Sequence, residues 1–96
     1  FQEQYLIKQL IGFYFSMQTS KLDQKLGSEI QRRRLEKGWS QEYLAEVTGL
    51  HRTYISQLER GLKSPSVRVL SHITKALNVT MGKFLHAVEE SLSVDK

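Results

Sequence analysis

The chain has 96 residues, no cysteine and a single proline. The absence of cysteine excludes disulfide scaffolds, cysteine-ligated zinc sites and thiol catalysis. The scarcity of proline, together with many Leu, Glu, Gln, Lys and Arg residues, favours helices. No apolar run approaches the ~20 residues that span a bilayer, so we expect no membrane partner. A chain this short buries little apolar surface, and oligomerisation is a natural way for it to gain stability.

Residues typical of metal and cofactor sites are also missing. His51, His72 and His86 lie 21 and 14 residues apart, with no HxxxH pair. Neither of the glycine motifs that bind nucleotide phosphates, GxxxxGK[ST] and GxGxxG, is present. The serines occur in caps and turns without a His/Asp context that would activate them. We therefore expect no metal, no cofactor, no small-molecule effector and no enzymatic activity.

The positive charge is confined to the middle of the chain. The formal net charge is +4, and residues 1–20 and 69–96 each sum to zero. A localised basic region favours a polyanionic partner, with nucleic acid first and an anionic membrane surface second, although a solvated surface has the same composition. The ten basic residues of 21–68, set against six acidic ones, are Lys21, Lys25, Arg32, Arg33, Arg34, Lys37, Arg52, Arg60, Lys63 and Arg68.

Helical periodicity and cap residues predict an all-α domain of five helices between residues 21 and 93. Glycines at 38, 49 and 61 end the first three helices, and Ser40, Ser66 and Thr80 are N-cap residues for the second, fourth and fifth. No apolar alternation typical of a strand is found. The predicted inward faces of the first and fourth helices are Leu22, Leu26, Ile30 and Leu35, and Val67, Leu70, Ile73 and Leu77.

The first twenty residues are predicted to be a separate N-terminal extension, and residues 94–96 a short tail. Residues 1–16 are mostly apolar and aromatic at helical spacing, interrupted by Gly12. They lack the small-residue cleavage site of a signal peptide, and Met17 is a natural start beyond them. If this segment is ordered, its apolar surface needs a partner. Whether it extends a dimer or packs against the last helix stays open.

The segment Gln41–Leu58 has the pattern of two short helices that meet at a sharp turn. The small Ala45 allows close helix approach, Gly49 permits the turn, and Leu50 fills it. Ile55 and Leu58 then face inward, which leaves hydrogen-bonding side chains on the outer face of the third helix. Such side chains can contact base edges from a major groove, and they are His51, Arg52, Thr53, Ser56 and Gln57.

Residues 22–92 resemble the phage-repressor/Cro type of helix-turn-helix. The resemblance rests on the pattern SQxxLAxxTGL…YISxLERG. Within that type the run Leu-His-Arg-Thr-Tyr-Ile-Ser, followed by Glu-Arg, is most similar to the small controller proteins of restriction-modification systems. Gln31 departs from the pattern, because the family often has Arg there. The contact with a DNA phosphate that Arg would make there is therefore in doubt. Arg32 and Arg33 can replace it, unless these two residues and Lys37 only face solvent.

The resemblance also implies roles for individual residues. Arg52, Thr53, Ser56, Gln57 and His51 match base-reading or adjacent phosphate-contacting positions. Arg34 and Glu59 match a buried ion pair that joins the first helix to the end of the third. Tyr54 matches a position that approaches the DNA backbone, with simple packing as the alternative. The other positions that match phosphate contacts are Ser40, Gln41, Lys63, Ser64 and Ser66.

One recognition helix contacts too few base pairs to specify an operator, and relatives of this type solve the problem by forming two-fold dimers. The sequence therefore predicts a homodimeric, cytoplasmic regulator that binds double-stranded DNA at a pseudo-palindromic operator. The alternative is a protein-interaction module, such as an antitoxin-like subunit. We expect the dimer interface on the apolar face of the fifth helix, and the alternative is that this helix only closes the core of its own chain. The predicted interface residues are Val79, Met81, Phe84, Leu85, Val88 and Leu92.

Overall fold

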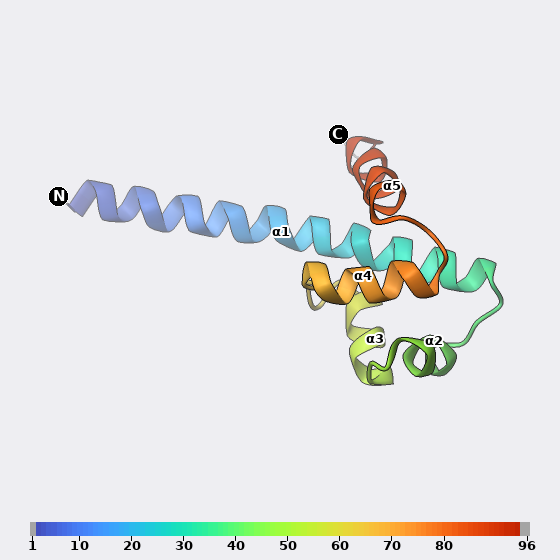
Figure 1. Ribbon diagram of the computed structural model, residues 1–96. Helices are drawn as coiled ribbons and strands as arrows, with labels where there is room; N and C mark the ends of the chain where they lie inside the picture. Colours follow the sequence, from blue (N-terminus) through green and yellow to red (C-terminus); the bar gives the residue numbers. More distant parts are fainter. Residues whose placement is uncertain (1, 95–96) are drawn as a thin grey trace.

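The computed structural model describes the backbone of residues 2–94 and the side chains of residues 3–11 and 21–94. Within these residues the fold is all-α, as predicted, and contains no strand. The five helices are α1 (Gln2–Glu36), α2 (Gln41–Thr48), α3 (Arg52–Glu59), α4 (Val67–Ala76) and α5 (Met81–Val94) (Figure 1).

The longest element is α1, a helix of 35 residues. At about 1.5 Å per residue it is about 52 Å long, which accounts for the 54 Å long axis of the molecule. Its N-terminal half projects away from the other four helices (Figure 1). The predicted boundary at residues 20 and 21 falls inside this helix, and the backbone also remains helical through Gly12.

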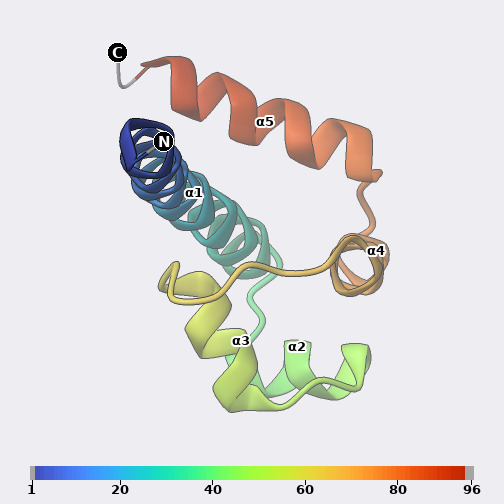
Figure 2. The ribbon, with the colours of Figure 1, turned by 90° about the vertical axis from the view of Figure 1, so that its left-hand side faces the viewer.

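The core lies around the C-terminal half of α1. In Figure 2, which looks along α1, this helix separates α5 from the pair formed by α2 and α3, and α4 lies to one side. Contacts join α1 to both α3 and α5. All five helices supply buried apolar side chains, namely Leu26, Ile30, Leu44, Ala45, Ile55, Leu58, Leu70, Ile73, Leu77, Phe84 and Val88.

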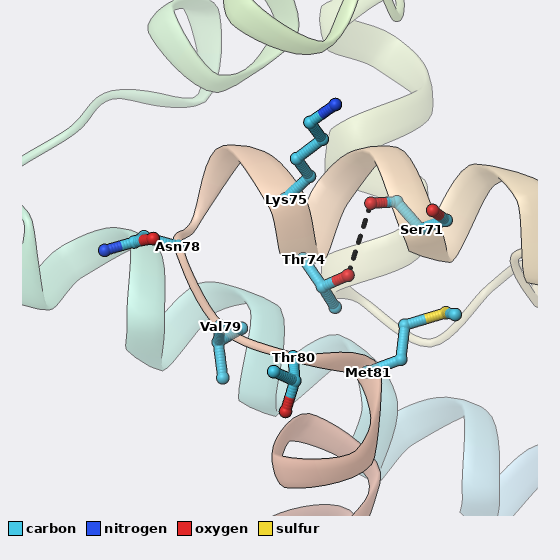
Figure 3. A pocket seen from close by; sticks show the side chains of 7 residues that line it. All are labelled: Ser71, Thr74, Lys75, Asn78, Val79, Thr80 and Met81. Atoms are coloured by element: carbon cyan, nitrogen blue, oxygen red, sulfur yellow. Dashed lines mark hydrogen bonds between the residues drawn. The ribbon is translucent and has the colours of Figure 1, made fainter.

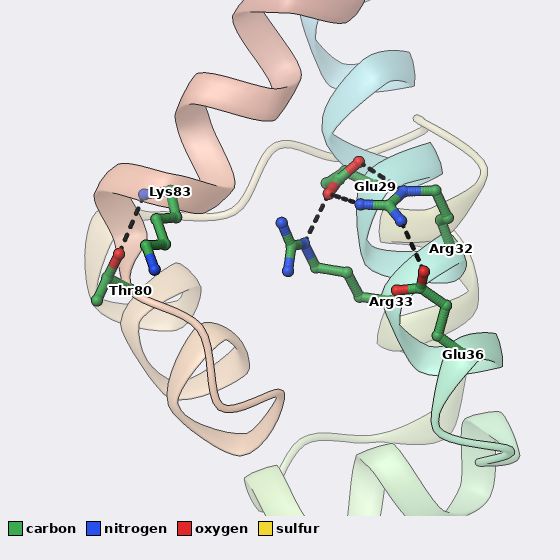
Figure 4. Close-up of polar contacts among 6 residues, drawn as sticks. All are labelled: Glu29, Arg32, Arg33, Glu36, Thr80 and Lys83. Atoms are coloured by element: carbon green, nitrogen blue, oxygen red, sulfur yellow. Dashed lines mark hydrogen bonds and ion pairs between the residues drawn. The ribbon is translucent and has the colours of Figure 1, made fainter.

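The predicted helix caps are confirmed. Ser40 Oγ accepts a hydrogen bond from Tyr43 N at 3.0 Å, and Ser66 Oγ accepts one from Val69 N at 3.1 Å. Thr80 caps α5 in the same way through Lys83 N (Figure 4). Each cap pairs a backbone N–H that has no partner inside its own helix, so these short polar residues set where the helices begin.

Three residues that we expected to face inward are exposed. Leu22, Leu35 and Val67 have exposed fractions of 37%, 58% and 74%. Leu35 lies nine residues after Leu26, which places it about half a turn round the helix from the buried face. Val67 is the first residue of α4, and burial on that helix begins one turn later at Leu70. Apolar character alone was therefore a poor guide to burial at these three positions.

A charged cluster on α1 faces α5 (Figure 4). Glu29 Oε2 lies 2.6 Å from both Arg32 Nη2 and Arg33 Nε, and Arg32 also pairs with Glu36. The Arg33 guanidinium lies 6.0 Å from the ring centroid of Phe84 on α5. Burial would raise the pKa of Glu29, but the hydrogen bonds from Arg32 and Arg33 lower it below its ordinary value. The ionised form therefore stabilises the fold at neutral pH, and this contribution is lost as the pH falls through that lowered pKa.

Candidate nucleic-acid interface

The helices α2 and α3 form a compact helix-turn-helix. Gly49 ends α2 in the left-handed region with φ 72°, a conformation that glycine adopts without strain. Leu50 N donates to Ala45 O at 3.0 Å, which closes the last turn of α2, and the Leu50 side chain packs against the core. His51 follows as the N-cap residue of α3. The predicted turn is present at the predicted residues.

The outward face of α3 carries the five residues predicted to contact bases. Ile55 and Leu58 are 0% and 1% exposed and fix which face of α3 points inward. Opposite them, the described surface is polar and solvent-accessible. His51, Arg52 and Thr53 are exposed, whereas Ser56 and Gln57 are half-buried.

The two residues predicted to contact phosphate at the start of α2 differ in their surroundings. Ser40 is exposed, and because its oxygen accepts from Tyr43 N, the hydroxyl proton remains free to donate. Gln41 is half-buried, and its Nε2 donates to Glu59 Oε1 at 2.9 Å. Its side chain thus belongs to an internal network, and its second amide N–H and its oxygen are not used by that bond. The backbone N–H of Gln41, which lies at the helix start, is also placed to bind an anion.

The remaining predicted phosphate contacts lie on α3 and on the loop from α3 to α4. Lys63, Ser64 and Ser66 are exposed on that loop, and Ser66 also caps α4. Tyr54 is half-buried and packs against the core, and the rest of its side chain remains accessible to solvent.

Arg34 and Glu59 form a buried ion pair with two contacts. Arg34 Nε and Nη2 donate to Glu59 Oε2 and Oε1 at 2.7 and 2.9 Å, and Nη1 donates to Trp39 O at 2.7 Å. Hydrogen bonding to Glu59 raises the pKa of Arg34 despite its burial, and the charges of Glu59 and Glu42 raise it further. This pair ties the end of α1 and the following loop to the end of α3, and so it holds α3 in place.

A second ion pair joins the first turns of α2 and α3, and sequence reasoning missed it. Glu42 Oε1 lies 3.2 Å from Arg52 Nε, and the two side chains are 68% and 57% exposed. The contact shows that the N-termini of the two helices lie side by side. Because the two residues lie ten apart in different helices, helical periodicity does not relate them. Only their opposite charges indicated a pair in the sequence.

The apolar face of α5 divides into a buried edge and an exposed edge. Phe84 and Val88 are 0% and 1% exposed, so they belong to the core of the single chain. At about 100° per residue, Met81, Leu85 and Leu92 lie on the other edge of the stripe. Met81 and Leu85 are 36% and 39% exposed, and Leu92 and Val79 are half-buried. Charging Phe84 would therefore disrupt the fold before it reported on any interface.

An open hollow of about 370 Å³ lies where α4 passes into α5 (Figure 3). Lys75 is its only charged residue, so the lining offers no acid–base pair. Among the described residues, no group of His, Asp or Glu is arranged to hold a metal ion. The complete lining is Ser71, Thr74, Lys75, Asn78, Val79, Thr80 and Met81.

None of the described helices combines the length and the apolarity that a membrane crossing requires.

The turn geometry and the order of the helices define the class of protein. The helix-turn-helix family model matches residues 30–84, from the last two turns of α1 to the first turn of α5. This match covers more than half of the chain. The chain therefore belongs to the helix-turn-helix family.

The similar proteins include controllers of restriction-modification systems, which confirms the resemblance seen in the sequence. Control protein C.SmaI of Serratia marcescens is 48% identical over 46 residues, which are 48% of this chain and 55% of that protein. The chain thus spans little more than half of that relative. The structure of the controller C.Esp1396I, a tetramer in complex with its natural 35 base-pair operator, is 38% identical, with a TM-score of 0.66 over 72% of this chain and 91% of that chain.

A regulator outside the controller group is equally similar in fold. The clp gene regulator ClgR of Corynebacterium glutamicum has a TM-score of 0.74 and 30% identity over 77% of this chain and 79% of that chain. The architecture is therefore shared by helix-turn-helix regulators that are named for different regulatory targets.

Proposed function

We propose that this protein is a sequence-specific, DNA-binding transcriptional regulator of the restriction-modification controller type, and that it is cytoplasmic and not an enzyme. The observation that carries the proposal is the outward face of α3, where exposed hydrogen-bonding side chains stand beside the open N-terminus of α2. The similarity to C.Esp1396I, a controller solved in complex with its operator, supports it.

In the proposed complex α3 enters the major groove. The guanidinium of Arg52 has the length and donor geometry to bind guanine O6 and N7, and Thr53, with its hydroxyl and methyl, is equally exposed. The backbone N–H groups and hydroxyl at the start of α2 face a phosphate, as helix N-termini do. Lys63 and Ser64 on the next loop bind the backbone further along. Base contacts then supply specificity, and the phosphate contacts hold the register.

Two substitutions separate these roles. Arg52→Ala is expected to weaken binding to the selected site by about 1–3 kcal/mol while binding to unrelated DNA changes little. Lys63→Ala is expected to weaken binding to all duplexes alike and to lower the salt slope by about one. Fluorescence anisotropy titrations at several salt concentrations measure both. Unchanged specific binding by the Arg52 variant would place the recognition surface elsewhere.

We further propose that the protein acts as a homodimer on a pseudo-palindromic operator. The support is the exposed apolar edge of α5, formed by Met81 and Leu85, of which Met81 also lines the hollow at the α4–α5 junction. A second copy related by a two-fold axis would cover this edge and place two α3 helices about 34 Å apart on one face of the DNA. With no effector site proposed, protein concentration and dimerisation would set operator occupancy.

Leu85→Asp tests the dimer. Because Leu85 is partly exposed in the single chain, the variant is expected to keep its helical circular dichroism but to sediment as a monomer. His86→Asp adds a charge at the next position, which is exposed and points away from the apolar edge, and it is expected to remain dimeric. A folded Leu85 variant that still sediments as a dimer would exclude this edge as the interface.

A protein-interaction module is the second candidate function. The observation in its favour is the projecting half of α1, whose exposed apolar surface is suited to docking. DNase I footprinting upstream of the gene separates the candidates, because a pure interaction module protects no palindrome there. The side chains concerned, each more than half exposed, are Tyr5, Leu6, Ile7, Leu10 and Ile11.

A further inference from the structure

We propose that Glu42 is a positioning residue for Arg52 and thereby a determinant of base preference. The inference rests on the proposed function, because it concerns the side chain assigned there to guanine. Its own basis is the ion pair between Glu42 on α2 and Arg52 on α3. Glu42 orients the guanidinium in the free protein, before DNA is bound.

The two side chains meet at the Nε atom of the guanidinium. Glu42 Oε1 contacts Arg52 at Nε, 3.2 Å away. The two terminal nitrogens, Nη1 and Nη2, carry four of the five N–H donors of an arginine. Two parallel donors are what guanine O6 and N7 accept in the major groove. A carboxylate at Nε therefore orients the planar group through a nitrogen that a bidentate contact by Nη1 and Nη2 does not use.

The pair contributes little to the stability of the fold. Both side chains are more than half exposed, and exposed ion pairs are weakened by water and salt. Its effect instead lies in the freedom of Arg52, a long side chain that loses many rotamers when it is fixed in a complex. A guanidinium already held by Glu42 loses fewer of them on binding the correct base.

The negative charge of Glu42 also favours selectivity. The residue lies in the first turn of α2, beside the helix start that faces a phosphate in the proposed complex. A carboxylate there repels the DNA backbone whatever the base sequence. Glu42 therefore lowers affinity for all duplexes and raises the preference for one base pair. This combination favours selectivity over tight binding.

A purely structural role for Glu42 predicts a different outcome. An acidic side chain in the first turn of a helix stabilises that helix through its dipole, and the charge of Glu42 also acts on Arg34. Either effect would appear in the melting temperature and leave the preferred base sequence unchanged. Base preference at one position is thus the measurement that isolates positioning.

The experiment selects binding sites from random duplexes with the full chain and three variants: Glu42→Ala, Arg52→Ala and the control Glu46→Ala. Glu46 is exposed on the same helix one turn later, and the described residues include no ion-pair partner for it. Both glutamate variants remove one negative charge near the DNA. They should therefore bind unrelated duplexes slightly more tightly and to a similar extent.

We expect Arg52→Ala and Glu42→Ala to lose preference at the same base pair of the selected site. For Glu42→Ala the preference should fall about two- to tenfold, the range that the cost of fixing one long side chain spans. Glu46→Ala should keep the full preference. If Glu42→Ala keeps it as well, the positioning role is overturned, whereas a native chain that selects no consensus at all overturns the proposed function instead.

Discussion

Replacing Glu59 by alanine is expected to lower the free energy of unfolding by about 3–5 kcal/mol, because the substitution leaves a charged guanidinium buried without its partner. The side chains of Arg34 and Glu59 are 7% and 2% exposed, so water cannot replace the lost carboxylate. Gln41 Nε2 loses its acceptor in the same variant. Denaturant unfolding followed by circular dichroism measures the change.

Two controls make the Glu59 result specific. Glu46→Ala removes an exposed carboxylate from α2 and is expected to change stability by less than about 0.5 kcal/mol. The double variant Arg34→Met, Glu59→Leu removes both charges together, and it is expected to be more stable than Glu59→Ala alone. A loss no larger than that of Glu46→Ala would mean that the buried pair does not hold α3 against α1.

The second large effect is expected at Gly27, where α1 crosses the end of α3. A Cβ atom on this residue would lie 2.1 Å from Leu58 O and 2.7 Å from Glu59 O. Both are backbone atoms, so a rotamer change cannot relieve the overlap and the helices must move apart. Gly27→Ala is expected to destabilise the protein by about 3 kcal/mol, at the upper end of the usual cost of overpacking. Thermal and denaturant unfolding both measure it.

Gly82 provides the matched control within α5. A Cβ atom there meets nothing within 4 Å, so Gly82→Ala only adds helix propensity and is expected to stabilise the protein by about 0.5 kcal/mol. Because α3 carries the proposed base contacts, Gly27→Ala is also expected to weaken specific DNA binding. Equal stability of the two alanine variants would contradict the close crossing of α1 and α3.

Local sequence signals predicted much of the recognition unit. Ser40, Gly49 and Ser66 act within a few residues of themselves, through a cap hydrogen bond or a left-handed backbone, and they mark the ends of helices wherever the fold places them. Ile55 and Leu58 follow helical spacing and are buried as expected. Short-range rules were sufficient because the helix-turn-helix is itself a short-range structure.

The same rules were wrong where neighbouring elements decide burial. Phe84 and Leu85 are adjacent apolar residues of one helical stripe, yet the first is 0% and the second 39% exposed. Only the position of α1 and α4 beside α5 separates them. The hydrogen bond from Gln41 to Glu59, 18 residues away, was likewise absent from the sequence prediction.

The sequence by itself determined the family, the five helices of the domain, the turn and the confinement of the +4 charge to residues 21–68, because periodicity, caps and motif residues act locally. Only the tertiary structure decided that α1 is one continuous helix, that Gly27 is a point of close backbone contact, and that Glu42 lies against Arg52. The last two features depend on distances between residues of different helices. Such distances are set when the helices pack, and no periodic pattern encodes them.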